Sequence, residues 1–282
     1  MAGRAVGLGS ICYHHAHATK PGQPVSKQYD VYYEQPLSER LRLFLRLETL
    51  FSDSHAAARE NHAWASRSGL QDLCEILLTL SRNNVKQALI QNLDRQLTTV
   101  MRTLEAPEAD QDLCIHWRDQ LQKTIQRLHQ DPRQLDAGLR RNSFLESLRH
   151  RTVSASTSDA DTPALVHWLH QSPQLRRNDL SSWLGELQAT EAALSLTLQL
   201  TRDGSEISDE VAEQGFFHRN LPPPAAQMIR IGLMAGAELY PEISANRHRL
   251  SVRFLYAPGQ QSSHRSGQTQ DDVHFRCCIC QL

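Results

Sequence analysis

The chain has 282 residues, with 30 Lys and Arg against 31 Asp and Glu, and a net charge of −1 when His is neutral. This length suits one large domain or two of ordinary size. A general polyanion binder would be strongly basic, so the composition excludes that class unless a local patch carries the charge. Its six Cys are too few for a disulfide scaffold. No apolar run reaches the roughly 18 residues of a membrane-spanning helix, and we expect a cytoplasmic globular protein.

The first half of the chain is predicted to be helical. Residues 1–27 are rich in Gly, His and Pro without any period, and we expect a disordered N-terminal extension there. Residues 28–152 form a predicted helical domain that opens with a short strand at 29–34, which is free to join a sheet. Apolar residues recurring at steps of three and four then predict helices over 38–51, 70–80, 84–105 and 110–129.

A basic segment closes this domain. We predict a fifth helix over 134–151, in which Arg140, Arg141, Arg149 and Arg151 outnumber the acidic Asp136 and Glu146. The Ser-, Thr- and Asp-rich residues 152–161 that follow predict a loop.

The second domain, residues 153–282, is predicted to be β-rich. A short apolar run at 165–169 indicates a strand, and 179–202 has the period of a long helix. Residues 228–233, 249–256 and 273–279 alternate apolar and polar, which predicts an antiparallel sheet with one buried face. The polar segment 258–272 is interpreted as a flexible loop. The fold class is therefore α+β: a helical N-terminal domain and a C-terminal domain with an antiparallel sheet and a long helix.

No motif for catalysis or for cofactor binding is found, which disfavours an enzyme but leaves one of unknown chemistry as an alternative. The C-terminal residues His274, Cys277, Cys278 and Cys280 have atom types that suit zinc. In a strand, however, Cys277 points away from Cys278 and Cys280, so we predict buried thiols and no metal site. A zinc protein that uses this cluster remains an alternative.

Arginine clusters are the most informative feature of the charge pattern. Strand geometry places Arg249 and Arg253 on the polar face of 249–256, with Ser251 between them. Two like charges there repel each other unless a partner neutralises them. An acidic peptide would do so, and so would an intramolecular Glu. Two further clusters lie elsewhere in the chain, at Arg40, Arg42 and Arg46, and within the basic segment 134–151.

Three segments resemble one family. They are YEQPLSERLRLFLRLE (33–48), HWLH (167–170) and LYPEISANRHRLSVRFL (239–255). Together they are similar to the ZapD family of bacterial cell-division proteins, and the resemblance runs from about residue 25 to the end of the chain.

The resemblance implies a homodimer with a helical and a β-rich domain, without enzymatic activity or cofactor. Such a protein binds the C-terminal tail of FtsZ through a basic surface and crosslinks and bundles FtsZ filaments to stabilise the division ring at midcell. From the residues, we expect no nucleic-acid partner, because the chain is not basic and has no recognisable reading motif, and no membrane partner, because it lacks a long apolar run. A cytosolic nucleic-acid-binding protein that uses 134–151 remains an alternative from the residues alone.

The resemblance also implies a set of tail-binding residues. Arg46, Arg249 and Arg253 match basic positions of the family site, and Arg247 stands at a position that is also basic there. Ser143 and Val166 stand where the family has Arg and His. The basic side chains that we expect to replace them are Arg140, Arg141 or Arg149 for the first, and His167 or His170 for the second.

Overall fold

The computed structural model describes residues 31–82, 84–130, 135–152, 162–221, 226–257 and 267–281. Its helices lie mostly in the N-terminal part and its antiparallel sheets in the C-terminal part, which confirms the predicted α+β class. The predicted extension 1–27 lies outside the described residues. So do nearly all of the predicted loop 152–161 and residues 258–266 of the predicted loop 258–272.

The chain forms two compact units, and each is discontinuous in sequence. Residues 1–42, 95–118 and 199–282 make one, here called the sheet unit, and residues 43–94 and 119–198 make the other, here called the helical unit. The division after residue 152 that the sequence suggested stays a prediction.

The four N-terminal helices were predicted correctly, with longer bounds in the structure for the first two. Ser38 accepts a hydrogen bond from the backbone N–H of Leu41, and Asp110 accepts one from that of Leu113, so both act as helix N-caps. The helices are α2 (Glu39–Ala57), α3 (Ala63–Arg82), α4 (Val85–Leu104) and α5 (Gln111–Gln130).

The single helix predicted over 134–151 is wrong. The structure has a short 3₁₀ helix, η1 (Leu139–Arg141), and then α6 (Ser143–Thr152). Asn142 separates them with extended backbone, and its Oδ1 accepts hydrogen bonds from the N–H groups of Phe144 and Leu145. A side-chain cap in mid-segment therefore starts a new helix.

The strand predicted at 165–169 is also wrong, because this segment is the helix α7 (Pro163–Leu169). Pro163 occupies the first helical turn, where its missing N–H costs nothing. Leu165 and Trp168, three residues apart, are the buried side chains. The run was too short for its period to separate a helix from a strand.

The long helix predicted over 179–202 is two helices, α8 (Pro173–Glu186) and α9 (Gln188–Asp203). Leu187 interrupts them, with φ −96° and ψ 1°. Ser172 caps α8 by accepting a hydrogen bond from the N–H of Leu175. The helix therefore begins at Pro173, six residues before the predicted start at 179. The apolar stripe continues through the break, since Leu184 and Leu187 are both buried.

A buried arginine ties helix ends together in the helical unit. α3 packs against α6, α7 and α8, and Arg176 of α8 is only 4% exposed. Its guanidinium donates to Ser66 Oγ at 3.0 Å, to the Asn61 carbonyl at 2.7 Å and to the Leu169 carbonyl at 3.2 Å. Carbonyl and hydroxyl oxygens thus solvate this buried cation.

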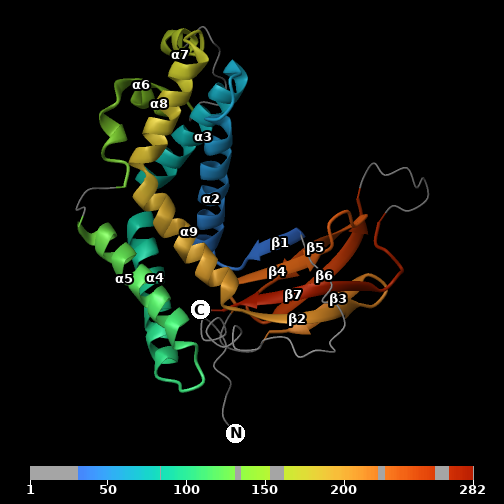
Figure 1. The fold of residues 1–282 in the computed structure, drawn as a ribbon. Coiled ribbons are helices and arrows are strands. Elements are labelled where there is room, and N and C mark those ends of the chain that lie inside the picture. The colour runs from blue at the N-terminus through green and yellow to red at the C-terminus, as the bar shows by residue number, and fades with distance from the viewer. Residues whose placement is uncertain are drawn as a thin grey trace. The chain divides into compact units, whose positions relative to one another are not determined.

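The sheet unit contains two antiparallel sheets (Figure 1). One has the strand order β1-β4-β7-β2 and the other β3-β6-β5. Three strands confirm the predicted alternating runs, and β1 does pair with β4; β2, β3 and β5 were not predicted. The strands are β1 (Val31–Pro36), β2 (Ser205–Ala212), β3 (Phe216–Asn220), β4 (Met228–Leu233), β5 (Leu239–Ala245), β6 (Arg249–Tyr256) and β7 (Val273–Cys280).

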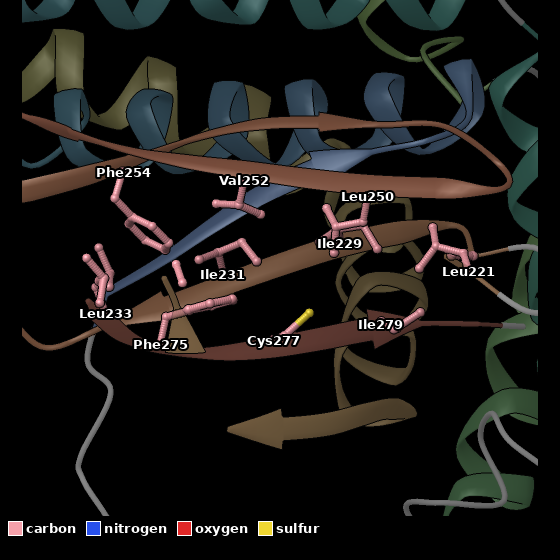
Figure 2. Close-up of a cluster of buried hydrophobic side chains, with 13 residues drawn as sticks. Leu221, Ile229, Ile231, Leu233, Leu250, Val252, Phe254, Phe275, Cys277 and Ile279 are labelled. Atoms are coloured by element: carbon pink, nitrogen blue, oxygen red, sulfur yellow. The ribbon is translucent and has the colours of Figure 1, made fainter. Parts of the chain in front are cut away.

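The two sheets share one hydrophobic core. Figure 2 shows the inward side chains of β6 directed towards those of β4 and β7. Phe254 and Phe275 are both fully buried and their ring centroids lie 5.1 Å apart. Burial of β6 alternates as the sequence predicted, which leaves Arg249 and Arg253 on the outer face of the three-stranded sheet.

An ion-pair network holds the other face of the four-stranded sheet. Glu34 of β1 accepts from Arg202 Nε at 2.8 Å and lies 2.9 Å from Arg230 Nε of β4. Burial raises the pKa of Glu34, but the hydrogen bonds and charges of Arg202 and Arg230 outweigh burial and lower that pKa below its ordinary value. Glu34 therefore stays ionised and links β1 to β4 and to the end of α9.

Candidate functional site

The outer face of the three-stranded sheet is the candidate site. Its central strand β6 turns Arg249, Ser251 and Arg253 outward. The register puts Arg253 directly opposite Phe216 of β3 on one side and Glu242 of β5 on the other. Directly opposed residues in an antiparallel pair point to the same face, so all three side chains share this surface.

Arg253 forms an exposed ion pair. Its Nη2 lies 3.2 Å from Glu242 Oε2, and the two side chains are 58% and 54% exposed. Pairs this exposed contribute only about 0.2–1 kcal/mol, because water screens the charges and two long side chains lose rotamer freedom. The guanidinium of Arg253 is therefore exchangeable between Glu242 and another carboxylate.

A hollow of about 690 Å³ opens beside this pair. Phe216 is 43% exposed on its rim and stacks on His218 with 6.1 Å between ring centroids. The hollow thus combines a cation, an aromatic ring and hydroxyl groups. It is lined by Phe216, Glu242, Ile243, Ser244, Ser251, Arg253 and Gln268.

The turn between β5 and β6 presents two more arginines. Asn246 Oδ1 accepts hydrogen bonds from the N–H groups of His248 and Arg249, at 2.9 and 3.0 Å, and so fixes the turn. Arg247 lies in the turn and Arg249 follows it, and both are exposed. Among the residues that the structure describes, neither has an ion-pair partner. The structure thus gathers Arg247, Arg249 and Arg253 on one hairpin.

Arg46 lies in the helical unit, on α2. Its Nε donates to Glu75 Oε1 of α3 at 2.7 Å, and Arg46 remains 65% exposed. The surroundings are acidic: burial, with the charges of Asp53 and Glu75, raises the pKa of Asp72. Arg46 therefore forms an exposed ion pair within its own unit, as Arg253 does.

Arg140 and Arg149 share a buried carboxylate. The side chain of Asp136 is fully buried, with Arg140 Nε at 2.8 Å and Arg149 Nη1 at 3.7 Å from its Oδ2. Arg149 also contacts Glu146 at 3.0 Å and is itself only 17% exposed. Both arginines thus complete the fold around η1 and α6, although Arg140 remains partly exposed, and Arg141 on η1 is also exposed.

The His residues near α7 make local hydrogen bonds. His170 caps the helix, and its Nδ1 donates to the Val166 carbonyl at 2.7 Å. Gln171 Nε2 donates to His167 Nε2 at 2.9 Å. Both His rings are exposed, and the structure leaves their predicted part in ligand binding untested.

The C-terminal cysteines lie in β7, which confirms the strand predicted there. Cys277 belongs to the core between the sheets, and Cys278 and Cys280 alternate to the opposite face. Burial raises the pKa of Cys277 to about 12 and also raises those of Cys278 and Cys280. Across the described ranges, no three His, Cys, Asp or Glu residues are placed to hold one metal ion.

Phe216 and Glu242 are the site residues that the sequence analysis missed. Both lie on strands that were not predicted. The available signal was weak: β3 has the inward residue Phe217, and β5 has the inward residues Ile243 and Ala245, two positions apart. Recognising β3 and β5 would have placed both residues beside Arg253.

Comparison with known proteins identifies the family. The family model described as a cell division protein, ZapD, matches residues 45–253. A ZapD of Coxiella burnetii (strain RSA 493 / Nine Mile phase I) is 32% identical over 252 residues, which cover 89% of this chain and 97% of the relative. ZapD proteins of Methylococcus capsulatus and Nitrosomonas europaea are 31% and 29% identical, over 89% of this chain and 98% and 95% of theirs.

These matches place the chain among bacterial cell division proteins. It belongs to the ZapD family. Within the described parts of the chain, no helix is both long and apolar enough to cross a membrane.

Proposed function

We propose that this protein is a non-enzymatic cell-division factor that binds the C-terminal tail of FtsZ and crosslinks FtsZ filaments. It acts as a homodimer in the cytoplasm and is recruited to the division site at midcell. The observation that carries the proposal is the outer face of the three-stranded sheet, where Arg249 and Arg253 are exposed on one strand in a member of the ZapD family.

The chemistry of this face suits a flexible acidic tail. Arg presents a planar fork of donors that matches a carboxylate, and exposed Arg gives contacts that form and break readily. A single such contact is weak and sensitive to salt, because the Debye length falls from about 10 Å at 0.1 M to about 3 Å at 1 M ionic strength. A dimer carries two sites and a filament carries many tails, so crosslinking rests on avidity.

The test is a titration of the purified protein with a labelled FtsZ tail peptide at low and at high salt. We expect saturable binding that weakens as salt rises. Arg249→Glu and Arg253→Glu should each weaken it at least tenfold, about 1.4 kcal/mol, and should abolish filament bundling measured by sedimentation. Both variants should keep the circular dichroism and the dimer mass of the wild type.

Arg127→Glu is the matched control, because Arg127 is an exposed residue of α5 that receives the same change of charge. It should bind and bundle as the wild type does. Normal bundling by both the Arg249 and the Arg253 variant would overturn the proposed site, and absence of peptide binding at either salt would overturn the proposed partner.

A further inference from the structure

Arg253 stands between two neighbours of opposite character. Glu242 and Phe216 are its direct cross-strand partners, and all three side chains emerge on the outer face. Directly opposed Cβ atoms lie about 4.5–5.5 Å apart. A ligand that reaches the guanidinium therefore meets a carboxylate on one side and an aromatic ring on the other.

Glu242 occupies the position that an acidic ligand would need. Its Oε2 is 3.2 Å from Arg253 Nη2, and the pair is exposed enough to open at little cost. A ligand carboxylate must displace Glu242 and then remain close to its negative charge. Both effects lower the affinity for acidic ligands, so Glu242 acts as an internal competitor.

Phe216 supplies the second half of the subsite. Nearly half of its surface is exposed, although it borders a hollow of about 690 Å³ whose other walls include Ile243, Ser244 and Ser251. An apolar side chain laid on this ring would remove apolar surface of both partners from water, which favours binding by about 25 cal/mol per Å².

We propose that the hollow binds an acidic and an apolar residue of one extended peptide, two positions apart. The acidic side chain takes Arg253 from Glu242, and the apolar side chain packs on Phe216. The Arg253 guanidinium extends towards Glu242, on the side away from Phe216, so it lies further from the ring than the roughly 4.5–5.5 Å of directly opposed Cβ atoms. Same-side residues of an extended chain, roughly 6.5–7 Å apart, can therefore reach both groups. Within the hairpin of β5 and β6, Arg247, Arg249 and Arg253 stand against one carboxylate, Glu242, and this net positive charge complements such a peptide. This inference rests on the proposed function and names the pair of tail residues, one acidic and one apolar, that the hollow binds.

The chain offers a matched control for Glu242. Asp209 pairs with Arg276 directly across β2 and β7, with 3.0 Å between Oδ1 and Nε, and Asp209 is 62% exposed. Asp209→Asn therefore removes one charge from an equivalent cross-strand pair on the four-stranded sheet. It reproduces the change of net charge without touching the hollow.

The experiment measures the affinity of an FtsZ tail peptide by fluorescence anisotropy at low salt. Glu242→Gln should bind about two- to fivefold more tightly, and Asp209→Asn should change the affinity by less than twofold. Phe216→Ala should weaken binding about five- to tenfold, and Phe216→Leu should recover most of the loss. With a peptide whose acidic residues are replaced by their amides, the gain from Glu242→Gln should disappear.

The outcomes separate the two proposals. Tail binding that neither Glu242→Gln nor Phe216→Ala alters, or an equal gain from Asp209→Asn, would overturn the subsite and leave the FtsZ assignment standing. A tail peptide that binds neither the wild type nor Glu242→Gln would overturn both. Unfolding curves of the four variants show whether any loss comes from the fold.

Discussion

Burial controls the chemistry of the β7 cysteines. Because thiolates react and thiols hardly do, a raised pKa keeps these side chains inert at neutral pH. Cys277, with its pKa raised to about 12 by burial and by neighbouring Cys278, is almost entirely protonated at neutral pH. Burial also raises the pKa values of Cys278 and Cys280. We therefore expect iodoacetamide at pH 7.5 to leave all three unmodified in the native protein and to label them in guanidinium, with sites mapped by mass spectrometry.

The iodoacetamide labelling also tests the alternative that the β7 cysteines bind zinc. Protection by metal would require about one zinc per chain and would be lost when a chelator is added. Protection by burial is unaffected by the chelator and is lost only on unfolding. Labelling that rises when a chelator is added to the folded protein would contradict the buried-thiol interpretation.

Single residues of the site were predictable only where their own strand carried the signal. Arg249 and Arg253 were placed correctly on an outer face because Leu250, Val252 and Phe254 give β6 a strict two-residue period. The partner Glu242 could not be assigned, because register across strands is not encoded in a local pattern. The sequence did allow an intramolecular Glu as the neutralising group, and for Arg253 the structure identifies it.

Among the helices and strands, long apolar stripes predicted the element correctly, whereas short segments did not. The stripe of α4 predicted that helix within one residue at each end. β2 escaped notice because both of its faces carry charge: Glu206 and Glu210 pair with Arg219 of β3, and Asp209 pairs with Arg276 of β7. Ion pairs replace apolar contacts there, so the hydrophobic pattern that identifies a strand is missing.

Two helical glycines should respond differently to substitution by alanine, because only one of them lies where two helices pack closely. A Cβ at Gly69 of α3 would lie 2.7 Å from the Cβ of Ala57 of α2, whereas a Cβ at Gly185 of α8 would meet nothing within 4 Å. Gly69→Ala should therefore lower the free energy of unfolding by about 1–3 kcal/mol, because helices α2 and α3 must separate. Gly185→Ala should leave it unchanged or raise it by up to about 1 kcal/mol, because alanine favours the helix.

Urea unfolding followed by circular dichroism measures both changes. The wild-type m value should be kept, since neither substitution alters the surface exposed on unfolding by much. Equal stability of the two variants would contradict the close approach of α2 and α3 at Gly69.

For the whole molecule, the predicted tail-binding residues divide between the two units. Arg247, Arg249 and Arg253 belong to the sheet unit, and Arg46 belongs to the helical unit together with Arg140, Arg141, Arg149 and His170. The family match at 45–253 spans segments of both. Arg140 and Arg149 pair with the buried Asp136 of their own unit, whereas Arg46, like Arg253, holds an exposed pair that another carboxylate can replace. The hairpin arginines carry the proposed function, because Arg247 and Arg249 have no ion-pair partner among the described residues and share one hairpin with Arg253.

The proposed crosslinking by a homodimer predicts how a mixed dimer should behave. A dimer of one wild-type chain and one Arg253→Glu chain keeps a single intact hairpin, so it can hold one tail but cannot join two filaments. Co-expression of two differently tagged chains and purification through both tags provides this species. We expect it to bind about one tail peptide per dimer, with the affinity of a wild-type site, and to sediment FtsZ filaments no better than the doubly substituted dimer. A doubly tagged wild-type dimer, carried through the same purification, should bind about two peptides and bundle fully. Bundling by the mixed dimer at half the wild-type level or more would mean that each chain joins filaments on its own, and the avidity mechanism would fail.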